Sequence, residues 1–270
     1  DRNLNGQQKE KIKNFLEVFI NGENNQKLVD FPQFLNDFIF DREFISKTII
    51  NLSIGTVREF LSEKKRKKKQ YKSISSRLLQ AISYMTTAEV APFIESFIKT
   101  TSRPNPKLKH IRRFPKYFIS MISYIPKHLE PFLPQIVTSL EQSIDKAPLK
   151  SREINNSMKA CSLFFESYTD FENFAEFCLE KLDKALSTTH QSAIRLAKAI
   201  SAQFPALFEH HQEAVSKLIQ KLRDEISPDV IDIITRIITD IPEFHEEIVD
   251  TYRELLSNTK VMKRDHIWKA

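Results

Sequence analysis

A proline-containing phrase recurs along this chain and constrains its fold more than any other feature of the sequence. It consists of an aromatic or aliphatic residue, a proline, a few residues and a run of apolar positions, and it begins at Ile125-Pro126, Phe204-Pro205 and Ile241-Pro242. The prolines lie 79 and 37 residues apart. The first interval is therefore about twice the second, which indicates a repeat of ~40 residues. A repeat of this length with two helices per unit predicts stacked helical hairpins.

Apolar residues repeat with helical spacing through the last two-thirds of the chain. One stripe joins Ala193, Leu196, Ala197, Ile200 and Phe204. Ser227 is suited to a helix N-cap and Pro228 to the first helical position, and each proline of the phrase is expected to close one helix and open the next hairpin. We expect the first helices of the hairpins, the A-helices, at 55–64, 88–100, 130–145, 171–186, 206–223 and 243–257. The second helices, the B-helices, are expected at 70–85, 111–125, 151–168, 189–204 and 227–241.

Glycine is almost absent, with only Gly6, Gly22 and Gly55 in 270 residues. Tight β-hairpins and phosphate-cradling loops use glycine for positive φ angles, so this composition argues against a β-rich fold or a Rossmann-type site. The sequence therefore predicts an all-α chain of helices joined by short polar turns.

The domain organisation follows from the same period. Residues 55–257 are expected to form about five repeats of one array that spans 1–270. The repeats in 1–54 are less regular: 30–40 and 42–52 are expected to form one further helix pair, and 21–27 a loop. Residues 258–270 are expected to begin a truncated repeat, as in a fragment of a longer array.

These hairpins resemble HEAT repeats, a family of armadillo-like helical repeats, over roughly 55–257. The resemblance rests on the ~40-residue period, the proline near the start of the A-helix and the opening of a B-helix by Ser227-Pro228-Asp229-Val230. Most units lack the Asp-Pro and Val-Arg dipeptides usual in the family. The resemblance implies a right-handed superhelical solenoid of antiparallel helix pairs. In addition, 130–136 is similar to A-helix starts in importin-like transport receptors and in large ribosome-assembly HEAT proteins.

Charge divides the chain into a basic and an acidic half. Residues 1–152 carry 27 Lys/Arg and 15 Asp/Glu, a net +12, whereas residues 153–270 carry 14 and 20, a net −6. The cations of the basic half concentrate at the turns between the A- and B-helices, and successive turns of a hairpin stack emerge on one edge about 10 Å apart. We therefore predict a partner-binding basic ridge formed by Lys64, Lys65, Arg66, Lys67, Lys68, Lys69, Lys72, Arg103, Lys107, Lys109, Arg112, Arg113 and Lys116. A third turn adds Lys146, Lys150 and Arg152.

Two other interpretations of these cations stay open. Charged turns are ordinary solvated loops, and cations after a helix C-terminus are favoured by the helix dipole. The run 64–69 is also typical of a nuclear-localisation signal. If the partner is a nucleic acid, the candidate residues for base stacking are Tyr71, His110, Phe114 and Tyr117. Two of these, Phe114 and Tyr117, fall in an apolar stripe with Phe118 and Met121 and are therefore expected to be buried. Contact with a nucleic-acid backbone or an acidic protein segment is therefore favoured over sequence readout.

The sequence offers no catalytic or metal-binding pattern. Phosphate-loop, zinc-protease, serine-hydrolase and kinase motifs are absent. Cys161 and Cys178 are expected to be small buried side chains, and His210-His211 an exposed pair whose side chains diverge by about 100°. We therefore expect no enzyme activity, cofactor, metal or small-molecule substrate. No apolar run reaches the ~18 residues needed to cross a bilayer, so no membrane contact is expected.

The functional expectation is a non-catalytic protein-interaction scaffold that binds an extended acidic partner through the basic ridge. The family resemblance suggests a nuclear assembly, such as ribosome biogenesis or chromosome organisation, and a nuclear or nucleocytoplasmic location. Two alternatives remain: an importin-like nuclear transport receptor, and the helical-repeat region of a large regulatory protein or kinase.

Overall fold

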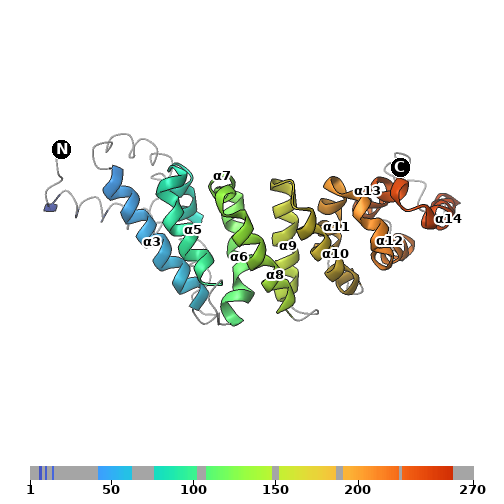
Figure 1. Ribbon diagram of the computed structural model, residues 1–270, viewed down its shortest axis with the longest axis horizontal. Helices are drawn as coiled ribbons and strands as arrows, with labels where there is room; N and C mark the ends of the chain where they lie inside the picture. Colours follow the sequence, from blue (N-terminus) through green and yellow to red (C-terminus); the bar gives the residue numbers. More distant parts are fainter. Residues whose placement is uncertain are drawn as a thin grey trace. The chain divides into compact units, whose positions relative to one another are not determined.

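The described part of the protein is all-helical, as predicted (Figure 1). The computed structural model describes residues 42–62, 76–101, 108–147, 152–186, 191–224 and 227–257, with the isolated residues Gly6, Gln7, Glu10 and Asn14. Residues 76–82 are helical. The other α-helices with defined bounds are α3 (Arg42–Ser62), α5 (Thr87–Lys99), α6 (Leu108–Tyr124), α7 (Pro126–Leu129), α8 (Leu133–Asp145), α9 (Arg152–Ser167), α10 (Glu172–Leu186), α11 (Gln191–Gln203), α12 (Gln212–Asp224), α13 (Pro228–Ile237) and α14 (His245–Ser257). The expected elements at 21–27, 30–40 and 258–270 lie outside the described residues.

The helix α3 is continuous where the sequence predicted two helices, 42–52 and 55–64. Gly55 lies within it and its missing Cβ would meet open space, so the backbone passes through without a turn. A mid-helix glycine costs only about 1 kcal/mol relative to alanine. Ile45, Ile49 and Val57 are buried on both sides of Gly55, and their burial outweighs that cost.

The three copies of the proline phrase make the same backbone bend. Ile125, Phe204 and Ile241 have φ angles of −132°, −133° and −133° and ψ angles of 42°, 58° and 65°. The following proline takes the first position of a short turn, where its missing N–H is not needed. Each proline therefore closes one helix and opens the next segment, as predicted.

Three A-helices begin later than predicted, because a 3-10 turn precedes each of them. The 3-10 turns Glu130–Phe132, Pro205–His210 and Pro242–Phe244 precede α8, α12 and α14, which begin at Leu133, Gln212 and His245. At the other end of a hairpin, α13 stops at Ile237 and the 3-10 turn Ile238–Asp240 completes the predicted span 227–241. Ser227 and Pro228 hold the predicted N-cap and first positions of α13, although the Ser227 side chain makes no capping hydrogen bond.

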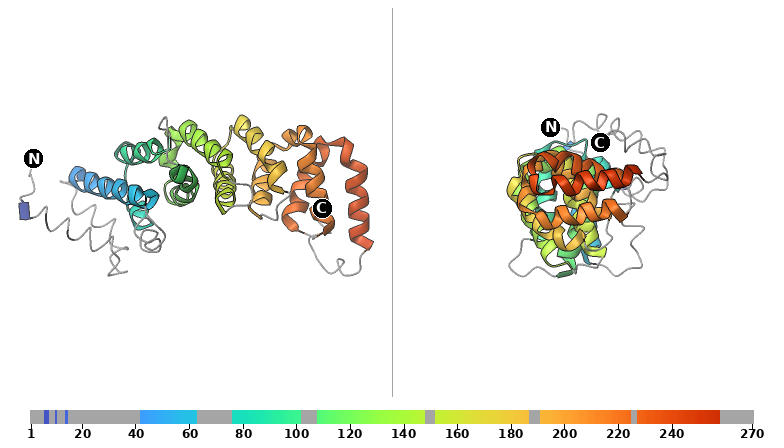
Figure 2. Two further views of the ribbon diagram at one scale, coloured as in Figure 1. Left: turned by 90° about the horizontal axis from the view of Figure 1, so that it is seen from below. Right: turned by 90° about the vertical axis from the view of Figure 1, so that its right-hand side faces the viewer.

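The chain divides into two compact units, 1–139 and 140–270. In the second unit, alternate helices pack in succession: α9 contacts α11 and α11 contacts α13, while α10 contacts α12 and α12 contacts α14 (Figure 2). In addition, α10 packs against α11, and α12 packs against α13. The apolar stripes predicted at 193–204, 215–226 and 230–241 line these contacts: their described members are buried except Phe204 and Ile238, which are half-buried, and Ile226 lies outside the described residues.

Polar side chains join successive helices of the second unit. In the α8, α10, α12, α14 series the joining pairs are Asp145–Lys181 (3.0 Å), Glu176–His211 (3.2 Å) and Glu247–Arg223 (3.3 Å). Between α11 and α13, Lys198 Nζ lies 2.7 Å from a carboxylate oxygen of both Asp229 and Asp232. The hydrogen bonds that Lys198 donates to these two carboxylates raise its pKa.

One of these pairs corrects the expectation that His210 and His211 form an exposed pair. His210 is exposed, but His211 is only 8% exposed, and its Nε2 faces Glu176. His211 ends the 3-10 turn that precedes α12, and the turn directs its ring toward α10. The expectation assumed α-helical geometry, whereas the two histidines lie at the end of a 3-10 turn and His211 has non-helical backbone angles.

Helix contacts and polar links, of which three follow, join the described residues of the first unit. Helix α3 packs against α5 and α6, and α7 packs against α5 and α6. The links are Ser46 Oγ to Glu89 (2.8 Å), Thr87 Oγ1 with His128 Nδ1 (3.0 Å) and Thr101 Oγ1 with Ser139 Oγ (2.9 Å). The predicted buried stripe of Phe114, Tyr117, Phe118 and Met121 is confirmed. Phe97 of α5 stacks on Phe114 with ring centroids 4.5 Å apart.

The start of α5 supplies a stability prediction. Thr86 is the N-cap: its hydroxyl accepts from the Glu89 N–H, and the Glu89 carboxylate accepts from the Thr86 N–H. Thr86→Ala should lower the free energy of unfolding by about 0.5–2 kcal/mol, measured by urea denaturation. Glu95→Ala, which removes an exposed ion pair with Lys99 on the same helix, should cost less than about 0.5 kcal/mol. If the two variants lost equal free energy of unfolding, the cap would stabilise the protein no more than the exposed ion pair does.

Candidate functional site

The structure describes four of the thirteen residues predicted to form the basic ridge. Lys109, Arg112, Arg113 and Lys116 all belong to α6. The other nine lie outside the described residues: Lys64, Lys65, Arg66, Lys67, Lys68, Lys69, Lys72, Arg103 and Lys107. The same holds for Lys150, whereas Lys146 and Arg152 are exposed.

The four described cations form one stripe along α6, here named the basic stripe. Their positions are i, i+3, i+4 and i+7, which fall on one face of a helix. Lys109 and Lys116 are exposed, and Arg112 and Arg113 are half-buried. The opposite face carries Ile111, Phe114, Phe118 and Met121, none of which is exposed. Burial of that apolar face fixes the helix rotation and turns the stripe outward.

No carboxylate lies near the basic stripe in the sequence. Between Glu95 and Glu130 the chain has no Asp or Glu and eight cations, namely Lys99, Arg103, Lys107, Lys109, Arg112, Arg113, Lys116 and Lys127. Two other helices pair a cation within the helix, Lys47 with Glu43 in α3 and Lys217 with Glu213 in α12, both at i, i+4, whereas α11 has cations and no carboxylate. The helix α6 has no acidic residue with which to do this.

The helix dipole also fails to account for the stripe. Lys109 and Arg112 lie in the first turns of α6, near the helix N-terminus, where the dipole is positive and disfavours cations. Moreover, the Nε atom of Arg112 is buried and has no hydrogen-bond partner. A buried donor without a partner costs about 1–3 kcal/mol. The helix dipole therefore does not explain why Lys109 and Arg112 stand near the start of α6.

Two exposed tyrosines near the stripe were not identified from the sequence. Tyr124, the last residue of α6, is 40% exposed, and Tyr84 is 47% exposed. The signal that would have found them is a repeated tripeptide, since Ile-Ser-Tyr occurs at both 82–84 and 122–124.

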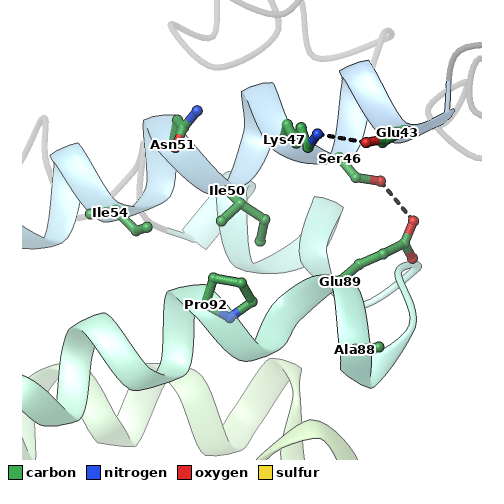
Figure 3. Close-up of a pocket in the computed structure, with 9 residues that line it drawn as sticks. All are labelled: Glu43, Ser46, Lys47, Ile50, Asn51, Ile54, Ala88, Glu89 and Pro92. Carbon is green, nitrogen blue, oxygen red and sulfur yellow. Dashed lines mark hydrogen bonds and ion pairs between the residues drawn. The ribbon is translucent and has the colours of Figure 1, made fainter.

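A groove between α3 and α5 is the second feature of the first unit (Figure 3). Its volume is about 530 Å³, and Ile50, Ile54 and Pro92 contribute apolar walls. Glu43 and Glu89 lie toward one end. Glu43 accepts a hydrogen bond from Lys47 at 2.5 Å, which lowers the pKa of its carboxyl, and Glu89 accepts one from Ser46. Both carboxylates are already hydrogen-bonded. The groove is therefore better suited to accept an apolar side chain of a ligand than a charged group.

The two cysteines are buried, as predicted. Cys161 and Cys178 are free thiols with no exposed surface. Burial raises the pKa of Cys178 well above its ordinary value, and the neighbouring Cys161 adds to the effect. Buried thiols of this kind are inert as nucleophiles at neutral pH.

Two absences concern the part of the chain that the structure describes. No group of three His, Cys, Asp or Glu side chains lies close enough together there to hold a metal ion. None of its helices has the length and apolar character needed to cross a bilayer.

Comparison with known proteins adds no relative. No protein-family model matches the chain, and no curated protein matches it significantly. The site must therefore be interpreted from its own geometry.

Proposed function

We propose that this protein is a non-catalytic scaffold that binds an extended polyanionic partner, either an acidic protein segment or a nucleic-acid backbone, through the basic stripe of α6. The observation that carries the proposal is the stretch between Glu95 and Glu130, which has eight cations and no carboxylate, with four of the cations on one outward helix face. We take Arg103, Lys107 and the run 64–72 to extend the same surface.

The scaffold part of the proposal is a solenoid of antiparallel helix pairs, right-handed and of the HEAT type. It is supported by the succession of contacts α9–α11–α13 and α10–α12–α14, because each unit of a solenoid contacts only its neighbours. The identical bends at Ile125, Phe204 and Ile241 support it as well. Solenoids present extended surfaces suited to extended partners.

Electrostatics would dominate such an interaction. Cations spaced one helical turn apart lie closer together than the Debye length of ~8 Å at physiological salt, so their fields add at the surface. A linear polyanion follows such a row and releases its condensed counterions on binding. An intracellular setting, nuclear or nucleocytoplasmic, supplies partners of this kind and belongs to the same proposal.

Charge reversal on α6 tests the proposal. The triple variant Arg112→Glu, Arg113→Glu, Lys116→Glu should abolish binding of fluorescein-labelled heparin in an anisotropy titration at about 50 mM salt, because it replaces three attractive charges by three repulsive ones. Wild-type binding should weaken steeply as salt rises. Lys116 is exposed but Arg112 and Arg113 are half-buried, so a melting curve must first show that the variant is folded at the temperature of the titration.

The matched control carries the same change of charge in the second unit. Lys159→Glu, Lys217→Glu and Lys221→Glu in one variant should leave heparin binding close to wild type. If both triple variants lose binding equally, net charge and not the basic stripe is responsible. If the wild-type protein binds no heparin at low salt, the proposal is wrong.

A further inference from the structure

The repeated Ile-Ser-Tyr tripeptide places an exposed tyrosine at the end of two successive B-helix segments. In both copies the residues around the tyrosine are buried: Ile82 and Met85 in the first, Ile122 and Ile125 in the second. Tyr84 and Tyr124 are 47% and 40% exposed. Among the large apolar side chains that the structure describes, the exposed ones are Tyr84, Leu108, Tyr124 and Val249, so exposure of this kind is uncommon here.

The fold brings the two tyrosine-bearing turns together. Thr87, three residues after Tyr84, has its hydroxyl 3.0 Å from Nδ1 of His128, four residues after Tyr124. The helices that follow the two tyrosines, α5 and α7, are in contact. The serine hydroxyls of both copies are bonded to their own backbone, Ser83 to Gln80 O and Ser123 to Ile119 O. The two tyrosine rings are therefore the exposed aromatic groups of these neighbouring turns, beside the exposed Lys127 and Glu130.

Tyr124 also shares a helix face with the basic stripe. At about 100° per residue, its position on α6 is within about 80° of the direction of Arg113 and Lys116. With a rise of about 1.5 Å per residue, Lys109 and Tyr124 lie about 22 Å apart along the axis. One face of α6 thus carries cations over its first half and an aromatic ring at its end, next to the turn that carries Tyr84.

We propose that this surface binds single-stranded nucleic acid, with phosphates along the basic stripe and bases stacked on Tyr124 and Tyr84. Combined cationic grooves and aromatic platforms are the usual means of binding single strands without sequence preference. A duplex keeps its bases stacked internally, and an acidic peptide or a sulfated glycan has no bases to stack. The inference rests on the proposed polyanion binding and adds the class of partner to it.

The test compares probes with and without bases on the same variants. Anisotropy titrations use labelled twelve-nucleotide oligouridylate, oligothymidylate of the same length, heparin and polyglutamate. Tyr84→Ala and Tyr124→Ala should each weaken binding of the single strands, by roughly 5- to 150-fold, as expected for loss of one stacked base. Binding of heparin should be unchanged. Tyr124→Phe, which keeps the ring, should bind nearly as wild type, and Val249→Ala serves as a control at an exposed apolar position in the second unit.

The outcomes separate this inference from the proposed function. If heparin binds and the two alanine variants lose no affinity for the single strands, the stacking inference is overturned and polyanion binding stands. If polyglutamate binds as tightly as the single strands, an acidic protein segment is the better partner and the inference is again overturned. If no probe binds, both proposals fail.

Discussion

Ile233→Asp should lower the free energy of unfolding by about 3–5 kcal/mol, because it leaves a buried charge without a partner. Ile233 has no exposed surface and lies in α13, which packs against α11 and α12. Its neighbours on the buried side, Val230, Ile234 and Ile237, are equally inaccessible and offer the carboxylate no hydrogen-bond donor. Urea denaturation followed by circular dichroism at 222 nm measures the loss.

The adjacent Asp232 is the control for this prediction. Its side chain is 49% exposed and pairs with Lys198, which keeps Asp229 as a second partner. Asp232→Ala should therefore cost less than about 1 kcal/mol. If Asp232→Ala proves more damaging than Ile233→Asp, the rotation of α13 deduced from its apolar stripe is wrong.

Phe164→Ala should be the second large destabilisation, about 3–5 kcal/mol, from lost burial and the cavity that remains. Phe164 is the centre of an aromatic cluster joining α9 to α10, with ring centroids 5.6, 5.2, 4.9 and 5.3 Å from those of Phe165, Tyr168, Phe171 and Phe174. Edge-to-face pairs at these distances add to the burial of the ring.

The measurement for Phe164→Ala is again the free energy of unfolding in urea. Leu108→Ala is its control, because Leu108 is 46% exposed and should lose less than about 0.5 kcal/mol. A loss below about 1 kcal/mol for Phe164→Ala would mean that the aromatic cluster does not hold the start of the second unit together.

The helices were predictable because their apolar residues follow a local period. In α11 and α13 the stripes read from the sequence are the residues now found buried. The proline phrase was equally informative, since proline imposes its own φ and restricts the residue before it. The continuity of α3 was missed although Ile49 and Val57, on either side of the predicted gap, are both buried.

Features that depend on contacts between helices were not predictable in this way. The burial of His211 depends on α10, and the position of Lys198 between two carboxylates depends on α13. Neither contact produces a recognisable pattern in the sequence around His211 or Lys198. At the candidate site, the cations of α6 were found from charge alone, but Tyr124 was missed because aromatic residues on a helix are usually buried. The ridge beyond α6 remains a prediction, since its residues lie outside the described part of the chain.

Lysine footprinting tests the central claim, polyanion binding on α6, most directly. The intact 270-residue chain is acetylated briefly with and without saturating heparin at about 50 mM salt, a regime in which such contacts are strong, and the modified lysines are quantified by mass spectrometry. We expect heparin to protect Lys109 and Lys116 several-fold while the exposed Lys47 and Lys159 react as before. Equal protection of all four lysines, or of none, would contradict the assignment of the binding surface to α6.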